Sequence, residues 1–308
     1  MKFLATLCIA ALSLASCNSL TPTAESTAEP IDASTCEADG QFTHIPGGEF
    51  IAGSDRAERD YAYEISASAG TDDREAIARR EANLRDRRWF DREPERQDAA
   101  TEDFCLQTFP VANRDYAEFV AATGHRAPYI SPEDYQTQGF LVHPYEAVRR
   151  FLWDGDRPPE GAEDHPVVMV SVSDAETFAR WLGDRDGFRY RLPTALEWEK
   201  AARGIDGEYF PWGNEWQDEA TNWAAQNDGG TLPVGAKPRD RSPFDVGDMA
   251  GNVFEYTGTQ QLGRVVMKGC SWDDSPGFCR AAYRHTRPPE SRHILFGFRL
   301  VRDAAAVR

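Results

Sequence analysis

The most constraining feature of this sequence is the density of turn-forming residues after Gly204. From there to the C-terminus, short segments alternate with clusters of Gly, Pro, Asn and Asp, which interrupt helices and strands. Few long elements fit between such turns, and neither an internal repeat nor an obvious domain boundary interrupts the pattern. The chain therefore predicts an irregular α+β domain with little regular secondary structure.

Helix signals concentrate in the middle of the chain. Two capping boxes, at 173–176 and 194–197, each place a hydroxyl three residues before a carboxylate. In this arrangement the two side chains satisfy the free amides of a helix start. The second helix is expected to run through Arg203 and to end at Gly204.

Four further segments have recognisable patterns. Residues 113–123 place Tyr116, Phe119 and Val120 on one face of a helix, and Gly124 provides a stop signal. The other three are a short strand between glycine turns over 44–54, an exposed and peripheral helix over 74–88, and a long loop region with prolines and aromatics over 129–164. Loops of that length tend to be functional or specific to one family.

The N-terminus carries a secretion signal. One early cation, Lys2, precedes an apolar run over 3–15 that is too short for a permanent membrane span. Residues 14–17 read Leu-Ala-Ser-Cys, the shape of a bacterial lipobox, which predicts removal of residues 1–16 and lipidation of Cys17. The alternative is an ordinary signal peptide in which Cys17 is incidental. A lipoprotein would be exported and membrane-anchored, in the periplasm or at the outer membrane of a Gram-negative host.

The rest of the chain divides into a tether and one domain. Residues 17–40 are rich in Thr, Ser, Ala, Glu and Pro and lack an apolar period, as expected of a flexible tether. Residues 41–308 are long enough for a single domain with a well-buried core. The eight Trp and a hydrophobic content of 41% favour a globular fold over disorder.

The charge balance is strongly acidic. The chain has 34 basic and 51 acidic residues, a net charge of −17. Phosphate contacts need clustered Lys and Arg, so nucleic acid and anionic lipid surfaces are poor partners for this chain, and no nucleic-acid partner is expected. The excess carboxylates either serve solubility or hold divalent cations.

Four cysteines belong to the predicted domain. Cys8 leaves with the signal and Cys17 would be lipidated. The remaining cysteines are Cys36, Cys105, Cys270 and Cys279. In an oxidising compartment these four allow three pairings, among which the sequence does not choose.

Seven segments in a fixed order carry a family resemblance. They are IPGGEFIAGS (45–54), FPVANRDYAEFV (109–120), RLPTALEWEKAARG (191–204), FPWGN (210–214), DMAGNVFEYT (248–257), KGCSWDD (268–274) and GFRLV (297–301). Together they resemble the formylglycine-generating, or sulfatase-modifying, enzyme superfamily, which includes ergothioneine-synthase and pyoverdine-maturation relatives. The resemblance spans 42–303. It implies the irregular formylglycine-generating-enzyme fold, which is related to C-type lectin domains, whereas activity depends on the site residues.

The resemblance implies two structural calcium sites. The first maps onto Asp248, Gly251, Val253 and Glu255, and the second onto Asn222, Trp223, Asp228 and Gly230. Carboxylates mixed with backbone carbonyls from tight loops are typical Ca²⁺ ligands. The alternative is that the two carboxylates of the first set merely cap turns.

The resemblance also defines where catalysis would occur. Formylglycine-generating enzymes hold Cu(I) with two cysteine thiolates just after a GGS motif, and soft thiolates suit Cu(I). Here Asp273 and Asp274 stand where the first family cysteine is expected. The candidate catalytic residues are instead Cys270, Ser271, Trp272 and Cys279. Oxidation of a sulfatase cysteine is therefore not expected.

Three states remain open for the pair of Cys270 and Cys279: a structural disulfide, a relocated metal pair, or inert thiols.

The same C-terminal segment offers further candidates. His285 and His293 could join a thiolate in a second metal site for iron, copper or zinc, although lone histidines are more often hydrogen-bonded structural residues. Arg280, Arg284 and Arg287 are expected to line the family's substrate cleft, where arginines suit a carboxylate or peptide ligand. Ordinary packing against an acidic surface is the alternative.

Two functions from different classes follow. The first is a metal-dependent oxidase, using copper or non-haem iron, that acts on an unknown periplasmic substrate. The alternative is a non-catalytic lipoprotein that binds a peptide, glycan or other small ligand, or has a structural role in the envelope. Free and adjacent thiols at Cys270 and Cys279 would favour the enzyme, whereas a closed disulfide would favour the alternative. The sequence has no P-loop, GxSxG, HExxH or dinucleotide motif.

Overall fold

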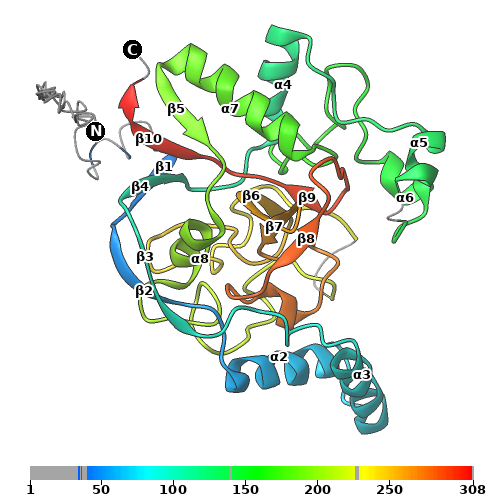
Figure 1. Ribbon diagram of the computed structural model, residues 1–308. Helices are drawn as coiled ribbons and strands as arrows, with labels where there is room; N and C mark the ends of the chain where they lie inside the picture. Colours follow the sequence, from blue (N-terminus) through cyan, green and yellow to red (C-terminus); the bar gives the residue numbers. More distant parts are fainter. Residues whose placement is uncertain (1–33, 35, 37–39, 139–140, 226–228, 307–308) are drawn as a thin grey trace, which may run out of the picture.

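The computed structural model describes residues 34, 36, 40–138, 141–225 and 229–306 (Figure 1). The predicted signal, Cys17 and most of the predicted tether therefore lie outside the described residues, as does Asp228 of the second calcium set. The described residues combine short strands, helices and long irregular connections, as the turn-rich sequence predicts. None of the described helices is both long enough and apolar enough to cross a membrane.

Within the part of the chain that the structure describes, three small antiparallel or mixed sheets form the framework. The first has the order β1-β4-β10-β5, the second pairs β2 with β3, and the third has the order β8-β7-β6-β9. The strands are β1 (Phe42–Ile45), β2 (Gly48–Ala52), β3 (Gln97–Thr101), β4 (Phe104–Gln107), β5 (Phe188–Arg191), β6 (Phe254–Gln261), β7 (Arg264–Lys268), β8 (His285–Arg287), β9 (Phe296–Gly297) and β10 (Val301–Ala306). The first sheet joins the two ends of the domain, because β4 lies between β1 and β10 and pairs with both.

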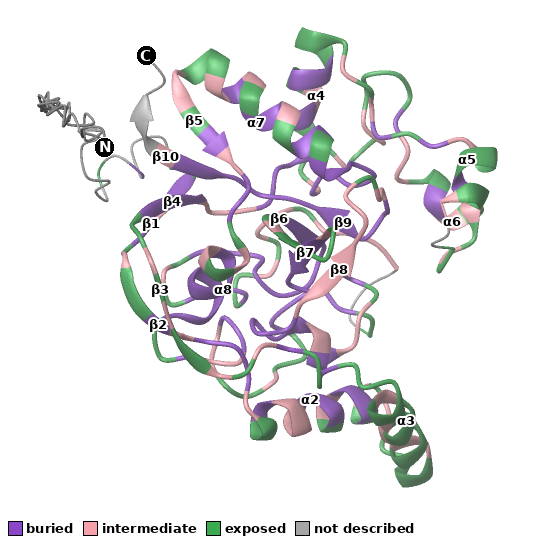
Figure 2. Cartoon of the chain, viewed as in Figure 1, coloured by how far each residue is buried: buried purple, intermediate pink, exposed green. Residues whose placement is uncertain are grey.

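The helices lie around these sheets. They are α2 (Arg56–Ser68), α3 (Arg74–Asp86), α4 (Asn113–Thr123), α5 (Pro132–Thr137), α6 (Tyr145–Arg149), α7 (Val172–Asp186), α8 (Ala195–Arg203) and the 3₁₀ turn η1 (Pro276–Cys279). Figure 2 shows buried residues along the central strands and α8, whereas α3 is mostly exposed. No residue of α3 is buried, which confirms the prediction of a peripheral helix.

The α4 and α8 predictions are confirmed at both ends. Helix α4 buries Tyr116, Phe119 and Val120 and ends at Gly124, which has a φ of 68°. Helix α8 begins with the capping box of Thr194 and Glu197 and ends at Gly204, as expected.

The predicted start of α7 is wrong by two residues. The capping box is made by Ser171 and Asp174 rather than by residues 173 and 176. Asp174 is also held from outside the helix, because Arg126 Nε donates to its Oδ1 at 2.8 Å and His125 Nε2 lies 2.8 Å from the same oxygen. These tertiary contacts select one of two overlapping local signals.

Two other predicted segments contain more structure than expected. The single strand predicted over 44–54 is two strands, β1 and β2, separated by Pro46 and Gly47. The predicted loop at 129–164 contains the short helices α5 and α6, and Tyr135 of α5 is buried. Helices of five or six residues are too short to show an apolar period in sequence.

Candidate functional site

Both pairs of domain cysteines are closed as disulfides. Cys270 is bonded to Cys279, with a Cα–Cα distance of 4.6 Å, and Cys36 is bonded to Cys105, with a Cα–Cα distance of 5.2 Å. All four side chains are buried. A sulfur in a disulfide is not a thiolate and does not ligate Cu(I) as a thiolate would. The structure thus selects the structural disulfide among the three states considered for Cys270 and Cys279, and contradicts the relocated metal pair.

The two aspartates at the position of the expected cysteine have separate partners. Asp274 accepts hydrogen bonds from the backbone amide of Ser271, at 3.0 Å, and from its hydroxyl. Burial raises the pKa of Asp274 to about 6. The Oδ2 of Asp273 lies 3.2 Å from Nε2 of His143. Burial raises the pKa of Asp273, and His143 opposes that shift.

His143 brings the 129–164 segment to the candidate catalytic residues. Its ring centroid is 5.3 Å from the ring of Trp272 and 5.7 Å from the ring of His293. Phe151 stacks on Trp272 at 6.0 Å with an interplanar angle of 9°. Trp272 is therefore buried under this segment rather than open to solvent. The length of the 129–164 loop marks it as a functional candidate, but no local pattern singles out His143.

The two histidines of the predicted second metal site have different surroundings. His293 contacts His143 and Phe296, whereas His285 stacks on Phe254 with ring centroids 5.2 Å apart. Burial is the main cause that lowers the pKa of each histidine to about 3. Within the described part of the chain, no three His, Cys, Asp or Glu side chains are grouped so that they could hold a metal ion. The pairing of His285 with His293 as ligands therefore finds no support.

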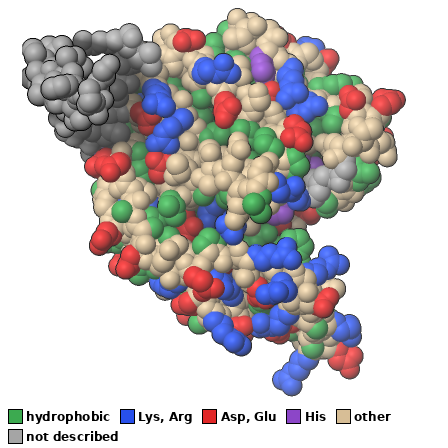
Figure 3. Space-filling view, in the orientation of Figure 1, with side chains coloured by type: hydrophobic (Ala, Val, Ile, Leu, Met, Phe, Trp, Pro, Cys, Tyr) green, Lys and Arg blue, Asp and Glu red, His purple; other side chains and the backbone are tan. Residues whose placement is uncertain are grey.

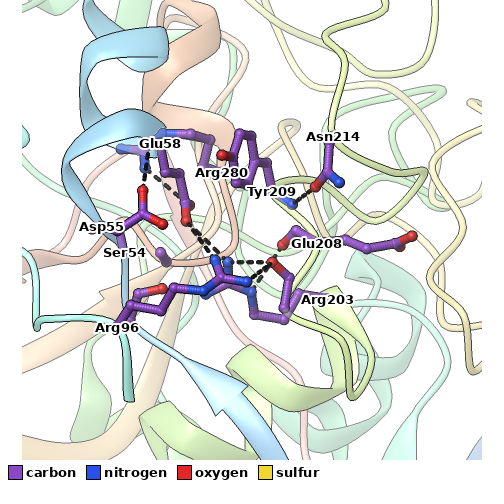
Figure 4. A network of polar contacts seen from close by, with 12 residues as sticks. Ser54, Asp55, Glu58, Arg96, Arg203, Glu208, Tyr209, Asn214 and Arg280 are labelled. Atoms are coloured by element: carbon purple, nitrogen blue, oxygen red, sulfur yellow. Dashed lines mark hydrogen bonds and ion pairs between the residues drawn. The ribbon is translucent and has the colours of Figure 1, made fainter. Parts of the chain in front are cut away.

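Arg280 lies in the interior rather than on a cleft. Its side chain is fully buried, and its Nη1 lies 3.1 Å from a carboxylate oxygen of Glu58 and 3.1 Å from one of Glu93. Figure 4 shows Arg280 pointing towards Glu58 of α2, with Arg203 of α8 beside it. Arg203 Nη2 donates to the other oxygen of Glu58 at 3.2 Å.

This ion-pair network continues to a lysine. Arg203 Nη1 lies 2.9 Å from Glu199 Oε1, and Lys268 Nζ of β7 lies 2.9 Å from Glu199 Oε2. Cations and anions thus alternate along one buried chain, which neutralises charges that would be costly if unpaired. The network is Glu93, Arg280, Glu58, Arg203, Glu199 and Lys268. The prediction that Arg280 binds substrate is wrong, because its guanidinium is committed to this network.

Arg284 and Arg287, in contrast, line a surface cleft of 690 Å³. One wall is the segment after α3 and the other is β8 with the β6–β7 turn. Figure 3 shows Lys and Arg side chains gathered on both sides of a hollow between the body of the molecule and the α2–α3 region. The cleft is lined by Arg87, Arg88, Trp89, Arg92, Glu93, Gln261, Leu262, Arg264, Tyr283, Arg284, His285, Thr286 and Arg287.

Positively charged side chains lie close together in this cleft, and each disfavours the charged form of its neighbours. Burial and the neighbouring Arg264 lower the pKa of Arg287. Burial, Arg287 and Arg264 lower the pKa of His285, in that order. The sequence did contain a signal for the missed wall, because Arg85, Arg87 and Arg88 stand close together beside Trp89 in an otherwise acidic chain.

The first calcium set does not fit a cation. Both carboxylate oxygens of Glu255 accept hydrogen bonds from Arg299, each at 2.7 Å, and Oε2 also accepts from Trp198 Nε1 at 3.0 Å. Arg299 Nη2 donates to the backbone oxygen of Asp248 at 2.9 Å. A buried guanidinium thus balances the charge that calcium was expected to balance, and the expected set of Asp248, Gly251, Val253 and Glu255 loses its main anionic ligand.

The second calcium set fits in part. The Oδ1 of Asn222 is buried and accepts no hydrogen bond from the described residues, whereas its Nδ2 donates to the backbone oxygen of Gly230 at 3.0 Å. An unsatisfied buried oxygen is suited to a hard cation. Trp223 and Gly230 lie beside Asn222 in this loop, and Asp228 is outside the described residues. Calcium at this loop stays a prediction.

Comparisons with known proteins identify the family. Residues 28–304 match the sulfatase-modifying factor enzyme 1-like domain. An inactive C-alpha-formylglycine-generating enzyme 2 from Mus musculus is 29% identical, over 86% of this chain and 87% of that protein. A hercynine oxygenase from Mycolicibacterium smegmatis is 30% identical, over 65% of this chain and 53% of that protein.

A solved structure agrees with this result at the level of the fold. The structure of PvdO from Pseudomonas aeruginosa superposes with a TM-score of 0.59 at 20% identity, and the match covers 87% of this chain and 96% of that chain. The family match covers nearly all of the described residues. The chain belongs to the sulfatase-modifying factor enzyme 1-like family of formylglycine-generating-enzyme relatives.

Proposed function

We propose that this protein is a ligand-binding member of its family that does not oxidise sulfatase cysteines. The observation that carries the proposal is the closed disulfide between Cys270 and Cys279. A copper oxidase of this kind needs two thiolates in the site. In this chain the sulfurs of Cys270 and Cys279 are bonded to each other. Asp273 and Asp274 supply hard oxygen donors, which are poor ligands for soft Cu(I).

The ligand site that best suits this function is the cleft of Arg284 and Arg287. Guanidinium groups at a partly enclosed surface bind carboxylates through paired hydrogen bonds. Similarity to a protein named as an inactive formylglycine-generating enzyme supports the view that the family scaffold persists without its oxidation chemistry. A peptide or small molecule with carboxylate groups is the expected ligand class.

The direct test of this proposal is a formylglycine assay. The soluble domain, treated with copper, is incubated in air with a peptide that contains the sulfatase CxPxR motif. We expect no aldehyde by mass spectrometry, while an active formylglycine-generating enzyme in parallel converts the same peptide. Robust turnover by this chain would overturn the proposal.

A metal-dependent oxidase of an unknown periplasmic substrate is the second candidate function. It is favoured by the contact of His143 with Asp273, at 3.2 Å, because an imidazole and a carboxylate are donors of the kind that iron takes. A hercynine oxygenase is among the relatives. Metal analysis of the anaerobically purified domain tests it. Iron or copper in stoichiometric amount, lost in His143→Ala, would favour this candidate over the first.

Anchoring through Cys17 belongs to the same proposal. The lipobox at 14–17 and the tether at 17–40 suit a lipoprotein held at the periplasmic or outer-membrane surface. Mass spectrometry of the purified full-length protein should find an acylated N-terminus at Cys17, and Cys17→Ser should abolish processing. An unmodified N-terminus elsewhere would contradict the anchor without affecting the binding function.

A further inference from the structure

Six arginines surround one cleft in a chain that is acidic overall. Arg87, Arg88 and Arg92 come from the segment after α3, whereas the other three lie at the start of β7, directly before β8 and in β8. The second group is Arg264, Arg284 and Arg287. Acidic residues outnumber basic ones by 51 to 34 in the whole chain. The cleft is therefore rich in basic residues, although the chain as a whole has more acidic ones. Its arginines come from segments far apart in sequence.

Most of these cations are not balanced by the protein itself. Arg88 has a carboxylate partner, since its Nε lies 3.3 Å from Asp91 Oδ2. Arg87, Arg92, Arg264 and Arg284 have no carboxylate within salt-bridge distance among the residues that the structure describes. Arg284 donates to the backbone oxygen of Arg92 at 3.0 Å, and Arg264 donates to the backbone oxygen of Thr286 at 3.0 Å. These neutral contacts orient the guanidinium groups without cancelling their charge.

The cleft is also shaped for an extended chain. β8 is an edge strand of its sheet, and edge strands are common sites for an added peptide strand. Trp89 is 36% exposed and Leu262, at the tip of the β6–β7 turn, is 96% exposed. An extended peptide places alternate side chains about 7 Å apart on each face. Apolar side chains can then contact Trp89 and Leu262, while acidic side chains reach the arginines.

We propose that this arginine cleft binds an extended acidic peptide segment of a partner protein. The proposal rests on the proposed binding function and names the ligand class for the same cleft. Several guanidinium groups on two walls require a ligand with several separated anions, rather than a single carboxylate. The acidic remainder of the surface repels polyanions that do not fit, so binding depends on the local match of charges.

The test uses the soluble domain and a fluorescein-labelled peptide of alternating glutamate and leucine. Binding is measured by fluorescence anisotropy at low and at high salt. The main variant is the double substitution Arg87→Gln and Arg92→Gln, since both side chains are exposed and make no hydrogen bond with another side chain among the described residues. We expect affinity to fall about tenfold or more in this variant, equivalent to one or two lost ionic contacts.

The matched control is Arg180→Gln. Arg180 lies on α7, away from the cleft (Figure 1). Its side chain contacts Thr177 and the backbone of Glu176, and no carboxylate of the described residues pairs with it. It should bind the peptide as the unmodified protein does. Arg284→Gln, on the opposite wall of the cleft, should weaken binding like the double variant, and melting temperatures of all variants show whether they are folded.

Two outcomes would overturn the proposal. One is affinity that is equal in the double variant, Arg284→Gln and the control. The other is preference for a sulfated oligosaccharide of matched charge over the peptide, which would assign the cleft to an anionic glycan. The formylglycine assay and the binding assay have separate readouts. An active oxidase that still binds the peptide through these arginines would refute the proposed function but not this inference.

Discussion

At the scale of single residues, two neighbouring arginines have opposite environments. Arg280 is fully buried between Glu58 and Glu93, whereas Arg284 is partly exposed and bonded to one carbonyl. Removing one member of a buried ion pair leaves an uncompensated charge, so Arg280→Met should lower the free energy of unfolding by about 3–5 kcal/mol. Arg284→Gln should change it by less than about 1 kcal/mol. Urea denaturation of both variants measures the difference, and equal values would contradict the burial of Arg280.

The sequence could not separate these two arginines. The acidic partners of Arg280 are 222 and 187 positions away, at Glu58 and Glu93. No local pattern reports such contacts, so both arginines looked equally suited to a cleft. The disulfides have the same limitation, because four cysteines allow three pairings and only the fold selects one.

His285 provides a pH-dependent prediction at the same scale. Its pKa in the folded protein is lowered to about 3 by burial and by Arg287 and Arg264. As the pH falls below about 6.5, the unfolded chain binds the proton first, so His285 lowers the free energy of unfolding by up to about 1.4 kcal/mol per pH unit.

The comparison with His285→Gln isolates this effect. Asp248 and Asp274 have pKa values raised to about 6 by burial, so they act in the opposite direction as the pH falls from about 6 to about 4. Urea denaturation between pH 4 and pH 7 gives the free energy of unfolding of both proteins. The value for the unmodified protein minus the value for His285→Gln should decrease as the pH falls. A pH-independent difference would show that His285 titrates normally in the folded state.

At the scale of elements, α7 shows how tertiary contacts decide between local signals. Ser171 is the N-cap and accepts a hydrogen bond from Arg126 Nη2 at 3.1 Å, whereas Ser173 is exposed. Ser171→Ala should therefore destabilise the protein by about 1 kcal/mol or more. Ser173→Ala should stay within about 0.5 kcal/mol of the unmodified protein. Thermal unfolding of the pair tests the register of the helix, and a larger loss in Ser173→Ala would restore the original prediction.

Elements with strong local signals were predictable. Helix α8 was assigned from its capping box and from Gly204, and α4 from its apolar face and Gly124. The β6–β7 hairpin turns through Leu262 and Gly263, with φ values of 50° and 73°, as two-residue hairpin turns require. Leucine rarely adopts this conformation, so no turn signal in the sequence marked the hairpin.

At the scale of the whole molecule, the fold depends on pairings that no local pattern reveals. The sheet order β1-β4-β10-β5 joins strands from both ends of the domain, and the buried ion-pair network connects α2, α8, β7 and the segment after η1. The ordered set of seven motifs indicated this fold through resemblance, and the family match confirms it. Composition alone predicted only an irregular α+β domain. The sequence indicated Arg284 and Arg287 on one wall of the arginine cleft. The prediction did not include the other wall, which comes from the segment after α3.

Cys270 and Cys279 form a structural disulfide in this family member. The most direct measurement is alkylation of the denatured protein without reduction, followed by peptide mass spectrometry. We predict a linked peptide pair containing Cys270 and Cys279, with both cysteines alkylated only after reduction. Alkylation of Cys270 and Cys279 without prior reduction, with no linked pair detected, would contradict the account. The two thiolates that a relocated copper pair requires would then be present.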